Sequence, residues 1–223
     1  MIYTFGILCF PGVQQLDLTG PYEVFASVPD ARVHLVWKDL QPVRSATGLI
    51  LIPDTTLAEA PDFDILCVPG GVGVNALLTD VEILRFIQVK AAKALFVTAI
   101  CTGSLVLGKA GLLAGKRATT HWNALDFLPS LGARVVKDRV VQDGNIITAG
   151  GVTSGIDFGL LLIAKIFGQE EAETIQLTLE YAPAPPFNSG SLSLTAPKIV
   201  AAARKRMEKA RQERENLLLA QPS

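Results

Sequence analysis

The sequence alternates between short apolar runs and helical patterns, and this alternation restricts the fold more than any other feature. The runs at 2–10, 63–68 and 94–99 are rich in apolar and β-branched residues, which is typical of strands buried in a parallel sheet. Each run leads into a glycine-containing or polar loop and then into a segment with helical spacing. The pattern predicts an α/β fold of the flavodoxin-like type, with a doubly wound, mostly parallel sheet and helices on both faces.

The remaining segments are predicted to extend this arrangement within a single domain spanning residues 1–223. Thr19 can cap a helix with Pro21 in its first turn, which leaves residues 13–18 as a loop. Asp80 can cap another helix. Other predicted elements are a strand at 31–38, a hairpin at 43–52 added to the sheet, a hairpin turn at 143–144, and helices at 156–167, 169–179 and 197–219. The Pro-rich segment 181–190 cannot be regular structure, so an arm and the last helix are expected over about 181–219.

Composition and charge give no support to several functional classes. The 223 residues are 49% hydrophobic and carry a net charge of -1, so the chain can bury a full core and nothing indicates binding to nucleic acid or to a membrane surface. The apolar run at 2–10 has no basic segment before it and is too short to cross a bilayer, which predicts a cytoplasmic protein. The spacing of Cys9, Cys67 and Cys101 suggests neither a disulfide framework nor a metal site.

Cys101 is the strongest candidate for a reactive group. The apolar run before it reads as a strand, and the small residues after it lead into a helical pattern, so the cysteine lies at a sharp strand-to-helix turn. Such a turn places the sulfur above the carboxyl edge of the sheet and beside the unpaired N–H groups of a helix, where thiol pKa values can fall to roughly 3.5–7.5. The alternative is that Cys101 is a small buried apolar residue.

Loops that follow other predicted strands carry further candidates. Asp17 comes after the first strand, and Gly70 and Gly71 come after the strand at 63–68. Because the carboxyl ends of parallel strands lie at one edge of a sheet, these loops are expected to meet at Cys101. The glycines are interpreted as a source of backbone N–H donors to an anion near the cysteine, with a tight turn as the alternative, and Asp17 could instead be a helix cap.

The same residues resemble the ThiJ/PfpI superfamily. The motifs that carry the likeness span nearly the whole chain: Ile100-Cys101-Thr102-Gly103, Pro69-Gly70-Gly71, Arg117-Ala118-Thr119-Thr120-His121-Trp122 and Gly150-Gly151. Within that superfamily, the segments 14–21 and 179–188 are similar to those of the isonitrile hydratases, also called isocyanide hydratases. The resemblance implies a class I glutamine amidotransferase-like fold and a homodimer.

The activity implied by the resemblance is the addition of water to an isonitrile, a small molecule, to give an N-substituted formamide without a cofactor or a metal. Cys101 would be the nucleophile and form a thioimidate, Asp17 would hold and transfer the proton, and Thr102 would support the nucleophile. Backbone N–H groups at Gly71 and Thr102, next to Gly70, would bind developing negative charge. A second glycine loop with Gly150, Gly151 and Val152 would line the substrate pocket.

Two departures from the wider superfamily bear on the chemistry. Thr102 stands where many members have a histidine, and Asp17 stands where many have a glutamate, so no Cys–His pair supports peptidase chemistry. His121 is expected to be structural or to line the pocket. Two alternative functions stay open: a glyoxalase- or deglycase-like cysteine hydrolase, and a non-catalytic redox sensor or small-molecule-binding module.

Overall fold

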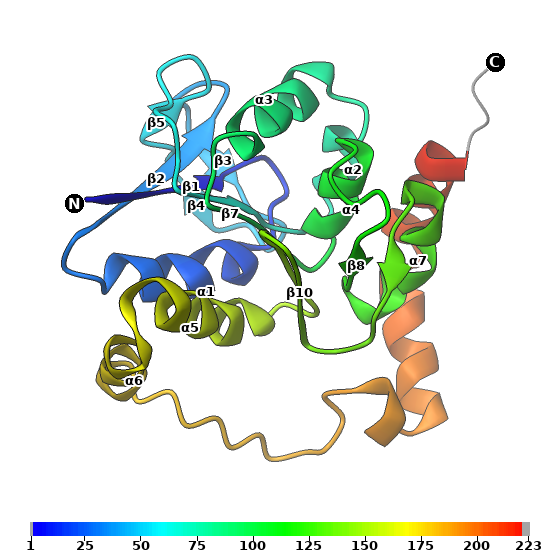
Figure 1. Ribbon diagram of the computed structural model, residues 1–223. Helices are drawn as coiled ribbons and strands as arrows, with labels where there is room; N and C mark the ends of the chain where they lie inside the picture. The colour runs from blue at the N-terminus through cyan, green and yellow to red at the C-terminus, as the bar shows by residue number, and fades with distance from the viewer. Residues whose placement is uncertain (1, 220–223) are drawn as a thin grey trace.

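A seven-stranded sheet forms the centre of the computed structural model, in the order β10-β11-β7-β6-β1-β2-β5 (Figure 1). All neighbouring strands are parallel except β10, which pairs antiparallel with β11. This order confirms the predicted flavodoxin-like, doubly wound and mostly parallel sheet. The structure describes residues 2–219, so Met1 and residues 220–223 of the predicted domain lie outside the described part of the chain.

The central strands are buried and largely apolar, as parallel strands covered on both faces must be. The sheet consists of β1 (Tyr3–Leu8), β2 (Ala31–Trp37), β5 (Thr55–Thr56), β6 (Ile65–Val68), β7 (Phe96–Ile100), β10 (Val140–Asp143) and β11 (Ile146–Ala149). Two small sheets lie outside it, formed by β3 (Val43–Arg44) with β4 (Ile50–Leu51) and by β8 (Arg117–Ala118) with β9 (Arg134–Val135).

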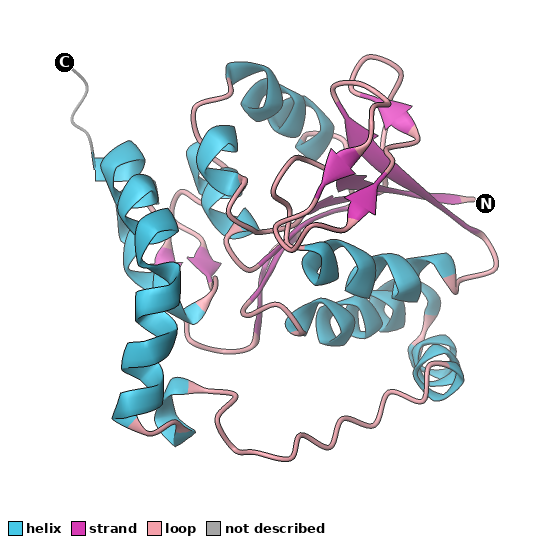
Figure 2. Ribbon diagram, turned by 180° about the vertical axis from the view of Figure 1, so that it is seen from behind, coloured by secondary structure: helices cyan, strands magenta, loops and turns pink. Residues whose placement is uncertain are grey.

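Helices cover both faces of the central sheet (Figures 1 and 2). One face carries α1 (Gln15–Ala26) and α5 (Ser154–Phe167), with α6 (Gln169–Thr178) packed on α5. The opposite face carries α2 (Val74–Leu77), α3 (Val81–Ala91) and α4 (Gly103–Lys109). The remaining helical segments are η1 (Trp122–Phe127), η2 (Pro129–Leu131), η3 (Leu192–Leu194) and α7 (Pro197–Leu219).

The chain leaves the body of the molecule after α6 and returns to it at α7. Figures 1 and 2 show the segment between them as an extended arm, and α7 then packs beside α2 and η1. The predicted Pro-rich arm and final helix are therefore observed. No helix within residues 2–219 combines the length and the apolar character needed to cross a bilayer.

Two predicted elements differ from the structure. The first helix begins at Gln15 rather than near Thr19, so Asp17 lies in its first turn and Pro21 lies inside the helix. A contact from another loop sets this start, because the Gln14 N–H donates to the Gly70 carbonyl at 2.8 Å. The hairpin at 43–52 does not join the central sheet but forms the separate β3–β4 ribbon.

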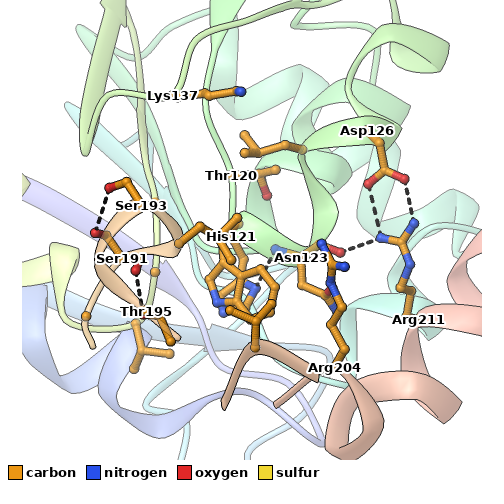
Figure 3. Close-up of a pocket in the computed structure, with 18 of the residues that line it drawn as sticks. Thr120, His121, Asn123, Asp126, Lys137, Ser191, Ser193, Thr195, Arg204 and Arg211 are labelled. Carbon is orange, nitrogen blue, oxygen red and sulfur yellow. Dashed lines mark hydrogen bonds and ion pairs between the residues drawn. The ribbon is translucent and has the colours of Figure 1, made fainter. Parts of the chain in front are cut away.

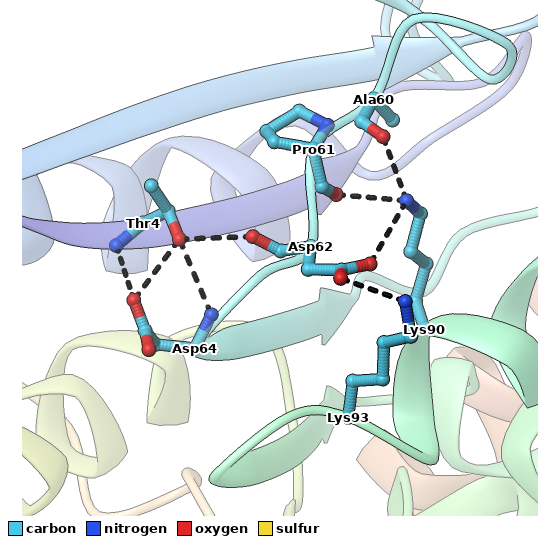
Figure 4. Close-up of polar contacts among 7 residues, drawn as sticks. All are labelled: Thr4, Ala60, Pro61, Asp62, Asp64, Lys90 and Lys93. Carbon is cyan, nitrogen blue, oxygen red and sulfur yellow. Dashed lines mark hydrogen bonds and ion pairs between the residues drawn. The ribbon is translucent and has the colours of Figure 1, made fainter.

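Buried polar contacts fix α3 and β1 to the segment before β6 (Figure 4). Lys90 of α3 donates to the carbonyls of Ala60 and Pro61 at 2.7 and 2.8 Å, which satisfies a buried ammonium group. Thr4 of β1 donates through its N–H to the Asp64 carboxylate at 2.8 Å. These contacts hold β6 in register, and β6 carries the Gly70–Gly71 loop at its carboxyl end.

Candidate active site

Four neighbouring strands bring the predicted site loops to one edge of the sheet. The strands β11, β7, β6 and β1 are consecutive and parallel, so their carboxyl ends lie together. Gly150 follows β11, Cys101 follows β7, Gly70 follows β6, and Asp17 follows β1. The topology thus places the candidate site loops at the edge where open α/β folds bind their ligands.

Cys101 occupies the sharp turn between β7 and α4, with its backbone in the left-handed region at φ 53°. Few non-glycine residues adopt this conformation, which is also that of the elbow that presents a nucleophile in α/β-hydrolases. The backbone N–H of Cys101 donates to the Ala149 carbonyl at 3.0 Å. Its carbonyl accepts from Thr120 Oγ1 at 2.6 Å and from Ser104 Oγ at 3.2 Å. The predicted strand-to-helix turn is confirmed, and these three hydrogen bonds stabilise its backbone.

Asp17, Gly70 and Thr102 meet beside this turn. The carboxylate of Asp17 is fully buried, and its Oδ2 accepts from the Gly70 N–H at 2.9 Å. A side chain on residue 70 would clash, because a Cβ there would lie 2.7 Å from both Asp17 Oδ2 and the Thr102 nitrogen. Gly70 therefore allows the close approach of the three loops.

The second oxygen of Asp17 is the free one. Asp17 Oδ1 is buried and receives no N–H or O–H donor from any residue in the described part of the chain. The Cys101 thiol lies close enough to this carboxyl group that each group shifts the pKa of the other. A carboxylate oxygen is thus available to accept the thiol proton.

Burial controls the electrostatics of this pair. It raises the pKa of Asp17 to about 7, although hydrogen bonds from the Gly70 N–H and the Cys101 thiol act in the opposite direction. Burial, followed by the negative charge of Asp17, raises the pKa of the Cys101 thiol well above its usual range. The hydrogen bonds that Thr102 directs at the sulfur are weaker than these two effects. The prediction of a lowered pKa at Cys101 is therefore wrong for the resting site.

One predicted role of the glycine loop also needs correction. The Gly71 N–H, expected to bind developing negative charge, donates instead to Thr102 Oγ1 at 3.1 Å. The Gly70 N–H is likewise engaged by Asp17. In this structure the loop orients the side chains of Asp17 and Thr102. The backbone N–H of Thr102 lowers the pKa of the Cys101 thiol.

A groove of about 1910 Å³ opens next to the Cys101 turn (Figure 3). It is bounded by η1, the β11–α5 loop, the end of the arm and α7, and the predicted pocket residues Gly150, Gly151 and Val152 line it. Cys101, Asp17, Gly70, Gly71 and Thr102 are not among its lining residues. Thr120 joins the two groups, because it lines the groove and donates to the Cys101 carbonyl.

His121 also lines the groove, as expected, and is neutral there. Burial, followed by the positive charge of Arg214, lowers the pKa of His121 to about 4. Its Nδ1 accepts from the Asn123 N–H at 3.3 Å, which leaves the ring proton on Nε2. Figure 3 shows the histidine beside Asn123 and Thr120.

Three polar residues near the site were not predicted. Thr120 was noted only as part of a motif, and a hydroxyl facing a neighbouring loop carries no local sequence signal. Asn75, on α2 directly after the glycine loop, is buried with Oδ1 unpartnered among the described residues. Arg214, on α7, is buried with Nε unpartnered in the same part of the chain. Its sequence context, a helix rich in basic residues, indicates a solvated face.

The other two cysteines are core residues. Cys9 and Cys67 are fully buried, and burial raises the pKa of each thiol to about 12. Across residues 2–219, no group of three or more His, Cys, Asp or Glu side chains is arranged to hold a metal ion.

Comparison with known proteins gives consistent matches. The model of the DJ-1/PfpI family matches residues 5–165. The isonitrile hydratase of Pseudomonas putida is 60% identical over 206 residues, which cover 92% of this chain and 90% of that protein. The protein DJ-1alpha of Drosophila melanogaster is 30% identical over 177 residues, which cover 76% of this chain and 80% of that protein.

Solved structures agree with the fold. A ThiJ/PfpI family protein from Pseudomonas syringae superposes with a TM-score of 0.94 at 39% identity, covering 98% of this chain and 91% of that one. Drosophila melanogaster DJ-1beta superposes with a TM-score of 0.72 at 24% identity, covering 81% and 98% of the two chains, and this likeness concerns the fold alone. The predicted class I glutamine amidotransferase-like fold is confirmed by these neighbours.

Proposed function

The chain belongs to the DJ-1/PfpI family, and we propose that it is an isonitrile hydratase, a cofactor-independent hydro-lyase that adds water to an isonitrile to give an N-substituted formamide. The observation that carries the proposal is the buried pair of Cys101 and Asp17 at the strand-to-helix turn. The 60% identity to the Pseudomonas putida enzyme over 92% of this chain supports the same substrate class.

The first half of the proposed reaction joins the sulfur to the substrate. Asp17, with a pKa of about 7, accepts the thiol proton as Cys101 attacks the terminal isonitrile carbon. The proton then passes from Asp17 to that carbon, and the product is the thioimidate R–N=CH–S–Cys. Thr102 lowers the pKa of the Cys101 thiol, and in this step it stabilises the negative charge that forms on the sulfur.

The second half releases the product. Asp17, again ionised, takes a proton from a water molecule that attacks the thioimidate carbon, and the nitrogen receives a proton from Asp17. The resulting intermediate, R–NH–CH(OH)–S–Cys, collapses with cleavage of the C–S bond. The hydroxyl proton returns to the sulfur through Asp17, which yields R–NH–CHO and restores the resting pair.

The limited exposure of the Cys101 sulfur favours a substrate with a narrow reactive end, such as an isonitrile. Cys101 is only 6% exposed, and the wide groove lies behind Thr120 and the Gly150 loop. An isonitrile ends in a linear N≡C unit, which needs a narrower passage than a planar carbonyl group with two substituents. We assign the groove residues Gly150, Gly151 and Val152 to the substituent R, and Gly70 and Gly71 to the orientation of Asp17 and Thr102.

We further propose that the protein is a homodimer that acts in the cytoplasm. Large apolar side chains remain exposed along α6 and the arm, at Leu177, Phe187 and Leu194, and a second copy would cover them. The three free cysteines suit a reducing compartment, where a catalytic thiol stays unoxidised.

Turnover of an aryl isonitrile by the purified protein tests the proposal. Formamide production is followed by absorbance, with the product identified by mass spectrometry. Cys101→Ala is expected to abolish turnover, because it removes the nucleophile, and Asp17→Asn to lower kcat by about 100-fold or more, because it removes the proton carrier. Cys9→Ala removes a buried thiol outside the site and serves as the matched control, with turnover retained.

Two results would contradict the proposal. Full turnover by Cys101→Ala would exclude the covalent route. Turnover of methylglyoxal by the wild-type protein without any turnover of isonitrile would indicate a glyoxalase-type hydrolase instead.

A further inference from the structure

Arg214 is an unusual residue for the helix that carries it. On α7, Arg214 is the buried residue, with 6% of its surface exposed. Its Nε is buried without a partner among residues 2–219, and no carboxylate in that range forms an ion pair with it. A buried cation without a counter-charge is costly, so a nearby negative group must be its partner.

The contacts of α7 direct Arg214 at the site loops. Asn75, two residues after Gly73 of the glycine loop, donates through Nδ2 to the Ala210 carbonyl at 2.9 Å. Arg211 pairs with Asp126 of η1, with 3.0 Å between Nη1 and Oδ1 (Figure 3). Residue 214 is one turn beyond Ala210 and shares its face of the helix. Arg214 is therefore placed between α2 and η1, the elements that directly follow two of the site loops.

The charges around Arg214 identify its partner. Burial lowers the pKa of the Arg214 guanidinium, whereas the negative charges of ionised Cys101 and of Glu213 raise it, so the cation lies within electrostatic range of the sulfur. The same cation contributes to the lowered pKa of His121. The titratable and charged groups facing this cluster are Asp17 beside Cys101, His121 on the groove, and Arg211 and Glu213 on α7.

We propose that Arg214 is a positioning residue for Cys101: α7 carries its guanidinium into the site, where it stabilises the thiolate formed when the proton moves to Asp17. Asn75 ties this part of α7 to α2, because its Nδ2 donates to the Ala210 carbonyl at 2.9 Å and to Glu213 Oε2 at 3.3 Å. The consequence for turnover rests on the proposed function, but the effect on the thiol can be measured without an isonitrile.

The test is the rate of Cys101 alkylation by iodoacetamide as a function of pH, with the adduct located by mass spectrometry. Cys9 and Cys67 do not interfere, because both are fully buried. Arg214→Met keeps much of the side-chain length and removes the charge. It is expected to shift the alkylation profile upward by about one pH unit, which slows the reaction about tenfold near neutral pH. Arg214→Lys keeps the charge and is expected to restore most of the rate.

Arg206→Met is the matched control. Arg206 lies on the same helix, is exposed and does not line the groove, so its loss changes the net charge equally without changing the alkylation profile. Arg214→Gln provides a second neutral variant if the methionine variant does not fold, and circular dichroism verifies folding.

The outcomes separate this inference from the proposed function. An unchanged profile in the folded neutral variants, or an equal shift in Arg206→Met, would overturn the role of Arg214 while leaving Cys101-dependent turnover intact. A shifted profile in a protein that does not turn over isonitrile would overturn the proposed function instead. If Arg214 has this role and the protein is an isonitrile hydratase, the neutral Arg214 variants are also expected to lose kcat about tenfold, because less thiolate forms during attack.

Discussion

At the scale of single residues, the site depends on a proton shared by two buried groups. A helix N-terminus alone would favour a thiolate at Cys101, but the short α4 and the hydrogen bonds from Thr102 do not outweigh burial beside a carboxylate. The resting pair therefore consists of a thiol and a carboxyl group that ionises near pH 7. In the proposed mechanism, ionisation of the sulfur is coupled to proton uptake by Asp17.

The raised pKa of Asp17 predicts a pH-dependent stability. Its pKa of about 7 in the folded protein exceeds the ordinary aspartate value of 3.8, so the folded state binds the extra proton and loses stability as pH rises through this window. The loss is at most about 4 kcal/mol, from about 1.4 kcal/mol per unit. Asp17→Asn cannot titrate and is expected to lack this loss. The measurement is urea unfolding of both proteins between pH 4 and pH 8.

The difference between the two proteins, rather than the wild-type curve, isolates Asp17. His121 has a pKa lowered from 6.5 to about 4, so it acts in the opposite sense, stabilising the fold as pH rises over that range. Both proteins retain His121, and its contribution cancels. Parallel stability curves for wild-type and Asp17→Asn would show that Asp17 is ionised with an ordinary pKa.

At the scale of secondary-structure elements, the sequence predicts what local patterns encode. Apolar runs ending in glycine or polar loops define the strands, and their carboxyl ends place Asp17, Gly70 and Cys101 together. Contacts between segments that are distant in the sequence determine the exact helix boundaries and the pKa values of the site. The start of α1 depends on the bond from Gln14 to Gly70, and the burial that raises the Cys101 pKa exists only in the folded chain.

The N-terminus of α3 is predicted correctly from the local sequence alone. Asp80, the predicted cap, accepts from the Ile83 N–H at 3.2 Å and pairs with Lys38 at 2.7 Å. Asp80→Ala is expected to lower the free energy of unfolding by about 1–2 kcal/mol, because a helix N–H loses its acceptor. Turnover is expected to be unchanged, since α3 contributes no residue to the site. Urea unfolding at pH 7 measures the loss.

Glu82→Ala is the control for that change. Glu82 pairs with the same Lys38 at 2.9 Å but is exposed and does not cap the helix. Its loss is expected to cost about 0.5 kcal/mol or less. Equal losses in the two variants would mean that the ion pair with Lys38, and not the cap, stabilises this end of α3.

At the scale of the whole molecule, the site depends on the return of the chain after the arm. The loops that carry Asp17 and Cys101 are assembled by the sheet, but α7 closes one side of the groove and carries the buried Arg214, the positioning residue that we propose. Seven basic residues lie on this helix from Lys198 to Arg214, and sequence alone does not distinguish the one that points inward. Packing against α2 and η1 makes that distinction.

The arm also provides the test of the proposed homodimer. Leu177, Phe187 and Leu194 are 81%, 78% and 68% exposed, and we expect a second copy to cover them. Sedimentation of the wild-type protein is expected to give a dimer, and Phe187→Asp a shift toward monomer at low concentration, because burying a carboxylate opposes association. Val81→Asp is the control, since Val81 is 77% exposed at the start of α3 on the other face of the sheet (Figure 1). A wild-type monomer, or dissociation caused by Val81→Asp and not by Phe187→Asp, would contradict an interface built on the arm.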